Sequence, residues 1–371
     1  MIKLEQLTKV FKTPNRDVMA ADHINMEVGK GEICVLLGPS GCGKTTTLKM
    51  INRIVMPTSG RVLIDGQDTT SLSTVDLRRK IGYVIQQIGL FPNMTIEENV
   101  CIVPRLLGWD TKRARIRAGE LLEMMALDPS IFLKRFPKEL SGGQQQRVGV
   151  ARALAADPPV MLMDEPFGAI DPINRASIQD EFLKLQRQLQ KTILFVSHDI
   201  DEAVKMGSKI AIFSAGKIVQ MGTPDDVLAH PAQPFIADFM GADRTLKRLG
   251  LIRVEQALHC AEIFVDADTS MEEAQRLMRN AHSDYLVVTS TDKTPLGYVT
   301  AANGTEGKCR DYLKRFRTSV VLGSDLKVAV SKMFETDMEW LPCVSEDGRY
   351  LGTVDQRTVT HLLGMTYLDK K

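Results

Sequence analysis

The sequence predicts an α/β protein, in which a parallel sheet with inserted helices is followed by a smaller α+β module. Short apolar runs that end in glycine or a carboxylate, such as 32–38 and 160–164, are typical of strands buried on both faces of a parallel sheet. A glycine-rich segment joins the first run to a predicted helix at 44–54. The last third of the chain instead carries an internal repeat with an offset of 55 residues.

The length of 371 residues is too great for one ordinary core, so two or three domains are expected. The net charge of +1 provides no global attraction to nucleic acid or to a membrane surface, and we expect no nucleic-acid partner. None of the six cysteines forms a Cys-x-x-Cys pair, which argues against a zinc site or a disulfide framework and favours reduced thiols in the cytoplasm. No signal peptide or apolar run of spanning length is found, so any membrane role would be that of a peripheral subunit.

The segment Gly38–Thr45 has the pattern Gly-x-x-x-x-Gly-Lys-Thr between a predicted strand and a predicted helix. Its glycines allow the backbone amides to turn inward toward a phosphate, and the following helix N-terminus adds positive partial charge. Lys44 would reach the β- and γ-phosphates, Thr45 would bind magnesium and Thr46 would contact the α-phosphate. A glycine turn without a ligand is the alternative, but the complete pattern favours a nucleotide. The residues expected to bind it are Gly38, Pro39, Ser40, Gly41, Cys42, Gly43, Lys44, Thr45 and Thr46.

Two carboxylates, Asp164 and Glu165, follow the apolar run that begins at Val160. At the carboxyl end of a parallel strand they would lie in the ligand crevice. Asp164 would hold magnesium through water beside Thr45, and Glu165 would orient and deprotonate an attacking water. The alternative is that both simply cap the next helix.

Two further strands place polar residues at the same edge. The strand predicted at 192–196 is followed by His198, which would lie near the γ-phosphate. The strand within 81–92 ends near Gln86, which would touch the metal ion or the attacking water, or would only cap its strand.

The segment "LSGGQQQR" (140–147) begins a second helix with an anion-binding N-terminus, about a hundred residues after the first. A single nucleotide would not need both of these helix N-termini unless they belong to different copies of the chain. In this segment the chain resembles the ATP-binding subunit of ABC transporters, because Leu140–Gln144 matches the signature motif of that family. The residues that the resemblance assigns to the partner subunit's ATP are Ser141, Gly142, Gly143 and Gln144.

The resemblance covers about residues 2–240, and it implies an ATPase domain at 1–240 with a helical subdomain at about 90–156. Within that family Glu165 corresponds to the catalytic base, Gln86 to the Q-loop glutamine and His198 to the H-loop histidine. Asp171 corresponds to the D-loop aspartate, although Ile170 stands before it where leucine is usual. Phe11 falls where the family stacks an aromatic ring on adenine.

The resemblance also implies cofactors and partners. ATP and Mg²⁺ would be bound in a head-to-tail homodimer, between Lys44 of one subunit and Ser141 of the other. Two transmembrane permease subunits and an extracytoplasmic substrate-binding protein would complete the transporter. The chain would then be peripheral, at the cytoplasmic face of the cell membrane.

The tail after a predicted linker at 241–251 is expected to hold two repeats, at 252–307 and 308–371. In register, Met278 matches Met333 and Tyr285 matches Trp340. Each copy is predicted as helix, strand, turn, strand and helix, which resembles a tandem CBS pair. The aspartate with which such modules often bind adenine nucleotides is missing at "TAAN" (300–303) and "DQRT" (355–358).

Between the repeats, "KCRDYLKRFR" (308–317) holds five basic residues in ten. A solvated charged helix is one interpretation. The other is a patch that contacts anionic lipid and senses ionic strength, because such an attraction is screened by salt.

An ABC subunit followed by CBS repeats resembles the importers of osmoprotectants such as glycine betaine, carnitine, choline and proline betaine. The sequences of three segments are similar to those of that group: 45–53, 77–92 and 164–172. The alternative is the ATPase of a polyamine or other small-solute importer, which usually carries a β-rich tail. A DNA-repair ATPase would carry a long coiled coil in place of the helices at 90–156.

Overall fold

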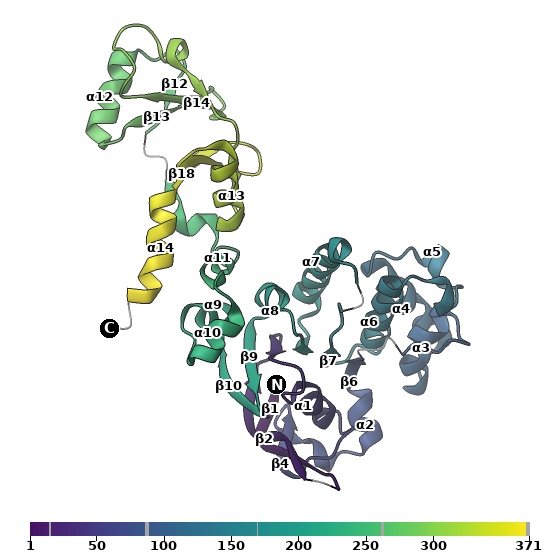
Figure 1. Cartoon of the computed structure of the whole chain (residues 1–371). Helices are drawn as coiled ribbons and strands as arrows, with labels where there is room; N and C mark the ends of the chain where they lie inside the picture. Colours follow the sequence, from purple (N-terminus) through teal and green to yellow (C-terminus); the bar gives the residue numbers. More distant parts are fainter. Residues whose placement is uncertain (15, 86–88, 169, 261–262, 369–371) are drawn as a thin grey trace. The chain divides into compact units, whose positions relative to one another are not determined.

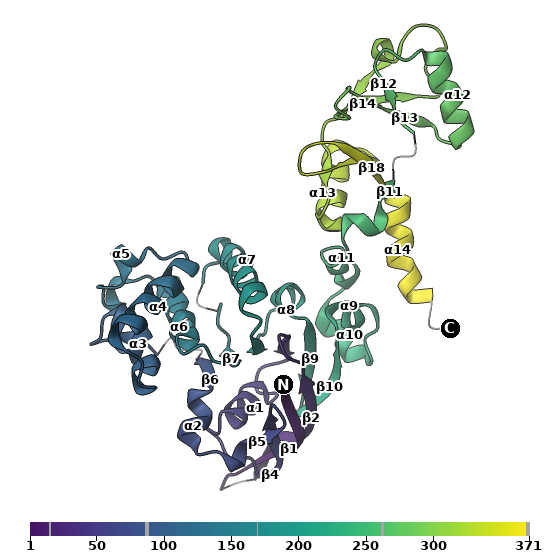
Figure 2. The same ribbon diagram turned by 180° about the vertical axis from the view of Figure 1, so that it is seen from behind.

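The computed structural model describes residues 1–14, 16–85, 89–168, 170–260 and 263–368. The chain forms two compact units, which Figures 1 and 2 draw from opposite sides. Unit 1 comprises Met1–Val227 and Pro231–Ile236, and unit 2 comprises Leu228–His230 and Ala237–Lys371. Each is described below by itself.

The centre of unit 1 is a six-stranded sheet in the order β10-β9-β3-β8-β7-β6. All neighbouring strands run parallel except β10, which is antiparallel to β9. The five residues of β3, β7 and β8 are all buried, which confirms the strands expected at 32–38, 160–164 and 192–196. The bounds are β3 Ile33–Leu37, β6 Ile81–Val84, β7 Val160–Asp164, β8 Thr192–Val196, β9 Lys209–Ser214 and β10 Lys217–Gly222.

A second, antiparallel sheet in unit 1 has the order β2-β1-β4-β5. Its strands are β1 Ile2–Lys12, β2 Asp17–Val28, β4 Ser59–Ile64 and β5 Gln67–Asp68. Apolar side chains of this sheet, such as Leu4 and Val62, share one core with Leu36 of β3 and Leu48 of the first helix. The two sheets therefore form one packed body.

Helices α3 to α6 of unit 1 form the helical insertion expected at 90–156 (Figure 1). Helices α3, α4 and α6 contact one another, and α6 also contacts β6. Side-chain caps define where they begin: Thr95 for α3, Asp110 for α4, Asp128 for α5 and Ser141 for α6. The bounds are α3 Ile96–Leu106, α4 Thr111–Met124, α5 Pro129–Phe132 and α6 Gly142–Leu154.

The other helices of the first 250 residues lie between the strands or after them. Their bounds are α1 Lys44–Ile51, α2 Thr74–Arg79, α7 Pro172–Leu189, α8 Ile200–Met206, α9 Pro224–Ala229, α10 Pro234–Met240 and α11 Arg244–Arg248, with the 3₁₀ turns Thr69–Ser71 and Pro137–Glu139. Helix α11 lies within the predicted linker 241–251. None of the described helices is long and apolar enough to cross a membrane.

Unit 2 repeats its elements at an offset of 55 residues, which confirms the predicted register. Helix α12 corresponds to α13, and Met278 and Met333 are buried at equivalent positions. The first copy contains the turn Val254–Ala257, β11 His259–Cys260, β12 Val265–Asp266, α12 Met271–Ala281, β13 Tyr285–Thr289 and β14 Pro295–Thr300. The second contains Cys309–Tyr312, β15 Lys314–Arg315, β16 Val320–Val321, α13 Leu326–Thr336, β17 Trp340–Val344, β18 Tyr350–Asp355 and α14 Gln356–Leu368.

The two copies in unit 2 exchange their first strands. Strand β11 pairs with β18, whereas β15 pairs with β14, so the sheets have the orders β11-β18-β17-β16 and β12-β13-β14-β15. The ranges 252–307 and 308–371 therefore do not each contain one complete sheet. This exchange leaves Leu249 and Val254 in one core with Leu341, and Cys309 in the other core with Leu286.

Candidate active site

Lys44 stands at the start of α1, directly after the glycine-rich loop. Its ammonium group donates hydrogen bonds to the carbonyl oxygens of Gly38 at 2.7 Å and Pro39 at 2.8 Å, and it lies 3.5 Å from the sulfur of Cys42. The side chain is only 6% exposed. The loop thus curls around its own lysine, as a cradle for a phosphate group requires.

Two glycines of this loop are required by close approach as well as by conformation. Gly38 and Gly43 have φ angles of 151° and 107°. A Cβ at Gly38 would lie 2.3 Å from the carbonyl oxygen of Phe213, and one at Gly43 would lie 2.2 Å from that of Ala20. Side chains other than hydrogen are therefore excluded at both positions.

The carboxyl end of β7 meets the start of α1 at Asp164. The Thr45 hydroxyl donates to Oδ1 of Asp164 at 2.9 Å. Burial raises the pKa of the Asp164 carboxyl above its ordinary value, the hydrogen bond from Thr45 opposes that rise, and neighbouring Glu165 adds to it. A bound cation would favour the charged form of this carboxylate.

These two side chains fit magnesium by their chemistry, because a hydroxyl and one carboxylate are oxygen ligands of the kind it takes beside phosphates. The described residues contain no group of three or more His, Cys, Asp or Glu side chains that would hold a metal ion unaided. Gln86, the third predicted metal contact, lies outside the described residues.

Glu165 lies close to His198, as expected for residues at the ends of adjacent strands β7 and β8. Nδ1 of His198 is 3.2 Å from Oε1 of Glu165. Glu165 has a left-handed backbone with a φ of 49°, which is uncommon for a residue other than glycine. Its N–H donates to the carbonyl oxygen of Val196 at 3.0 Å, and its own carbonyl accepts from the N–H of Gly168 at 3.1 Å. This geometry directs the carboxylate out of the sheet edge toward His198.

Asp171 is exposed and immediately precedes α7. Arg175, one turn into that helix, donates to the carbonyl oxygen of Ile170 at 2.9 Å and lies 3.6 Å from Asp199. Arg175 therefore connects the segment of Asp171 to the segment of His198.

The segment Ser141–Gln144 begins α6 with a capping box. The N–H of Gln144 donates to the hydroxyl of Ser141 at 3.3 Å, and the N–H of Ser141 donates to Oε1 of Gln144 at 2.9 Å. Ser141 and Gly142 are exposed. No hydrogen bond between described residues joins this segment to the glycine-rich loop of the same chain.

Phe11 is 38% exposed near the end of β1, opposite Val18 of β2. Ala20 of the same β2 strand supplies the carbonyl oxygen next to Gly43. The exposed ring is therefore carried by the strand pair that borders the glycine-rich loop.

Two residues of the site are absent from the sequence-based predictions. Gln146, 3% exposed, donates from Nε2 to the carbonyl oxygen of Glu165 at 3.3 Å. Glu202, 8% exposed, accepts from the hydroxyl of Ser197 and, at 3.0 Å, from Nε2 of Gln179. Both are polar residues on the buried face of a helix, and that periodicity is a signal in the sequence that could have identified them.

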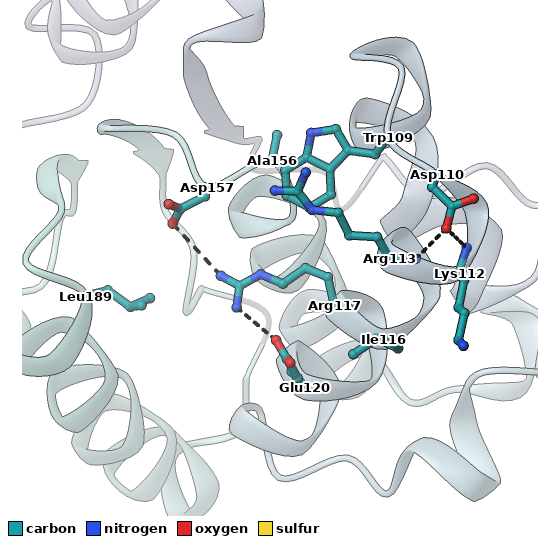
Figure 3. A pocket seen from close by; sticks show the side chains of 10 residues that line it. All are labelled: Trp109, Asp110, Lys112, Arg113, Ile116, Arg117, Glu120, Ala156, Asp157 and Leu189. Atoms are coloured by element: carbon teal, nitrogen blue, oxygen red, sulfur yellow. Dashed lines mark hydrogen bonds and ion pairs between the residues drawn. The ribbon is translucent and has the colours of Figure 1, made fainter.

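A pocket of unit 1, with a volume of about 840 Å³, lies between helix α4, the segment Ala156–Asp157 and Leu189 at the end of α7 (Figure 3). The Arg113 guanidinium stacks on the Trp109 ring at 3.8 Å, and Arg117 lies 3.2 Å from Glu120 and 3.9 Å from Asp157. Ile116 adds an apolar side chain that is 56% exposed. The pocket includes none of the predicted nucleotide-binding residues, so it is a separate feature of the surface.

Two family models match the chain. The ABC transporter model matches residues 21–168, and the CBS domain model matches residues 255–303. The first match contains the glycine-rich loop, Ser141–Gln144 and both carboxylates.

Relatives of known function match almost the whole chain. The osmoprotectant import ATP-binding protein OsmV of Salmonella typhimurium is 52% identical, over 98% of this chain and 96% of the relative. The glycine betaine/carnitine/choline transport ATP-binding protein OpuCA of Bacillus subtilis is 45% identical over the same shares. The choline transport ATP-binding protein OpuBA of the same organism is 44% identical.

Solved structures match the first part of the chain. A dimeric ATP-binding cassette bound to ADP and phosphate after hydrolysis is 37% identical, with a TM-score of 0.56. The match covers 60% of this chain and 98% of the cassette chain. A second dimeric structure, described as a bacterial ABC transporter cassette, is 38% identical with the same TM-score.

Proposed function

Since the chain belongs to the family of ABC transporter ATP-binding subunits that serve osmoprotectant importers, we propose that it hydrolyses ATP to power the import of quaternary amines such as glycine betaine, carnitine and choline. The observation that carries this proposal is the meeting of Lys44, Thr45, Asp164, Glu165 and His198 at the carboxyl edge of one sheet.

Each of these residues has a role that its position supports. The ammonium group of Lys44 moves from the loop carbonyls to the β- and γ-phosphates when ATP enters. Glu165 orients the attacking water and accepts its proton, while His198 stays within reach of the γ-phosphate. The exposed ring of Phe11 stacks on adenine.

Thr45 and Asp164 would hold Mg²⁺ together with the phosphates, and the family resemblance assigns Gln86 to the same set. When bound there, the cation would supply positive charge next to the phosphates. The 2.9 Å contact between Thr45 and Asp164 supports this assignment, because the two oxygen ligands already lie side by side.

Two copies pair head to tail, so that Ser141, Gly142, Gly143 and Gln144 of one subunit contact the ATP held by the other. The exposure of Ser141, its distance in sequence from the loop and the dimeric state of both related cassettes support this arrangement. Asp171 then lies at the interface between the subunits. Each isolated copy holds only half of every site, so it hydrolyses ATP slowly.

The pocket in Figure 3 receives a cytoplasmic segment of the permease. Its exposed Ile116 and stacked Trp109 offer apolar surface, and its arginines and carboxylates offer both signs of charge. In the proposed transporter the chain is peripheral at the cytoplasmic face, beside two permease subunits and an extracytoplasmic substrate-binding protein.

Unit 2 contacts anionic lipid through part of the segment 308–317. Lys308 and Arg310 share one carboxylate, that of Asp268, so their two positive charges are partly compensated. Lys314, Arg315 and Arg317 are exposed and form no ion pair with any described residue. These three residues, called the basic patch below, are the ones that a salt-sensitive lipid contact would use.

The experiment that tests the cargo expresses the complete transporter in cells that lack osmolyte uptake. Labelled betaine, carnitine, choline and spermidine are supplied at low and high osmolality, with a Glu165→Gln variant as the control for ATP dependence. We expect a quaternary amine to accumulate, more at high osmolality, and the variant to abolish uptake. Entry of spermidine without any quaternary amine would instead identify a polyamine importer.

A further inference from the structure

Gln146 has a buried side-chain amide that connects helix α6 to the backbone of Glu165. It lies on α6, five residues after Ser141, and its Nε2 donates to the carbonyl oxygen of Glu165 at 3.3 Å. A carbonyl oxygen only accepts hydrogen bonds, so the amide nitrogen must face Glu165 and the orientation of the side chain is determined.

The backbone that Gln146 holds is a strained one. Glu165 has a φ of 49°, a conformation that costs free energy in any residue with a Cβ and persists only where its surroundings enforce it. The N–H of Glu165 is held by Val196 of β8, and its carbonyl oxygen by the N–H of Gly168. Gln146 is the contact to this peptide that comes from α6.

The oxygen atom of the Gln146 amide argues against a purely stabilising role for this side chain. Its Oε1 is buried and has no hydrogen-bond partner among the described residues. An unpaired buried acceptor costs stability, and an apolar side chain of similar shape would avoid that cost. Stability alone therefore does not explain a glutamine at this position.

We propose that Gln146 is a positioning residue for ATP hydrolysis, which holds the Glu165 peptide so that the carboxylate points at the attacking water. The proposal rests on the role of Glu165 as the base. It also connects two sites, since the N-terminus of α6 faces the partner's nucleotide while Gln146 holds the carboxylate at the chain's own nucleotide.

The first test replaces Gln146 by leucine in the full chain, assembled with its transporter in liposomes. We expect Gln146→Leu to lower kcat for ATP hydrolysis by about ten- to a hundredfold, since small misplacements of a catalytic group have effects of this size. The KM for ATP should stay within about twofold, and the urea midpoint of the purified chain should be no lower than in the wild type.

Gln145→Leu is the matched control. Gln145 also donates from Nε2 to a backbone carbonyl, that of Leu140 at 3.1 Å, but it does not touch Glu165. This variant should keep the wild-type kcat. An unchanged kcat in Gln146→Leu, or a fall in kcat that matches a loss of stability, would overturn the proposal.

A double-mutant cycle with Glu165→Gln completes the test, read by single-turnover hydrolysis over hours. If Gln146 acts through the carboxylate, Gln146→Leu should have little further effect in the Glu165→Gln background. Equal effects in both backgrounds would show that Gln146 acts elsewhere. Wild-type hydrolysis by Glu165→Gln alone would instead refute the role of Glu165 in the proposed function, a result distinct from either outcome for Gln146.

Discussion

The hydroxyl of Thr45 donates a 2.9 Å hydrogen bond to Oδ1 of Asp164, across 119 residues of sequence. The contact exists because β3, which leads to Thr45, and β7, which ends at Asp164, both flank β8 in the same parallel sheet. It brings together the two oxygen ligands that the proposed function assigns to Mg²⁺.

Removal of either ligand should raise the magnesium requirement. Asp164→Asn should increase the Mg²⁺ concentration for half-maximal hydrolysis by about tenfold or more, because a neutral amide binds a hard cation more weakly than a carboxylate does. Thr45→Ser, which keeps the hydroxyl, should remain close to the wild type. A magnesium titration of ATPase activity measures both. A normal magnesium dependence in Asp164→Asn would exclude this carboxylate as a ligand.

The buried Glu202 should make stability depend on pH. Burial raises the pKa of its carboxyl, while hydrogen bonds from Ser197 and Gln179 oppose the rise. A raised pKa in the folded state means that the stabilisation is complete below the unfolded value, about 4.3, and is lost as pH rises through the folded value. Glu202→Gln cannot ionise, so its urea midpoint should rise relative to the wild type as the pH increases from about 4.3 toward neutrality. The exposed Glu123→Gln is the control, and a constant difference for Glu202→Gln across this range would contradict the argument.

The pocket shown in Figure 3 should be needed for assembly of the chain with the permease and not for folding of the chain. Ile116→Asp places a charge on its exposed apolar side chain and should lower the amount of permease that copurifies by about tenfold, since a buried unpaired charge is costly. Ile131→Asp alters a similarly exposed isoleucine, 48% against 56%, that does not line the pocket. Equal loss of permease in both variants would argue against this pocket as the docking surface.

The stacked pair Tyr285 and Trp340 should stabilise unit 2. Their ring centroids lie 3.8 Å apart at an angle of 9°, and the two residues occupy equivalent places in the two copies. Tyr285→Ala should lower the free energy of unfolding of unit 2 by about 2 kcal/mol. Tyr285→Phe keeps the ring and loses only the 3.4 Å contact with Thr353, so its effect should be small.

Trp340 reports this unfolding by its fluorescence. The chain has two tryptophans, so a Trp109→Phe background leaves Trp340 as the single reporter. Phe334→Ala, at a ring that is 74% exposed, is the neutral control. An unchanged transition in Tyr285→Ala would show that the stack contributes nothing to the stability of unit 2.

The basic patch should set the response to salt. Replacement of Lys314, Arg315 and Arg317 by glutamine should reduce binding to vesicles that contain anionic lipid, because each basic residue near such a surface contributes about 1 kcal/mol. The matched variant replaces Lys308 and Arg310, whose two charges are partly compensated by Asp268, and should lose less binding than the variant of the basic patch. Vesicle sedimentation at low and high salt measures the difference. Equal binding by both variants and the wild type would exclude the lipid contact.

The parallel sheet could be predicted because β3, β7 and β8 are short and almost wholly apolar, and because glycine follows β3 and two carboxylates stand at the end of β7. The 55-residue repeat could be predicted because equivalent residues pack in equivalent cores, as Met278 and Met333 do. The antiparallel sheet that precedes and follows the glycine-rich loop was not predicted. Its strands alternate irregularly between buried and exposed positions, and β1 carries register shifts that blur a period of two.

The sequence by itself indicated which residues the proposed chemistry would use, since the glycine-rich loop with its lysine and the carboxylate pair after an apolar strand are each local patterns in the chain. The tertiary structure brings Thr45 to Asp164 as expected, and it alone decided the direct contacts of Glu165, with His198 and, through its peptide, with Gln146. It also decided the exchange of β11 and β15 between the sheets of unit 2. A strand of two residues has too little local pattern to determine which of two equivalent strands it pairs with. The pairing therefore depends on the packing of the segments around it.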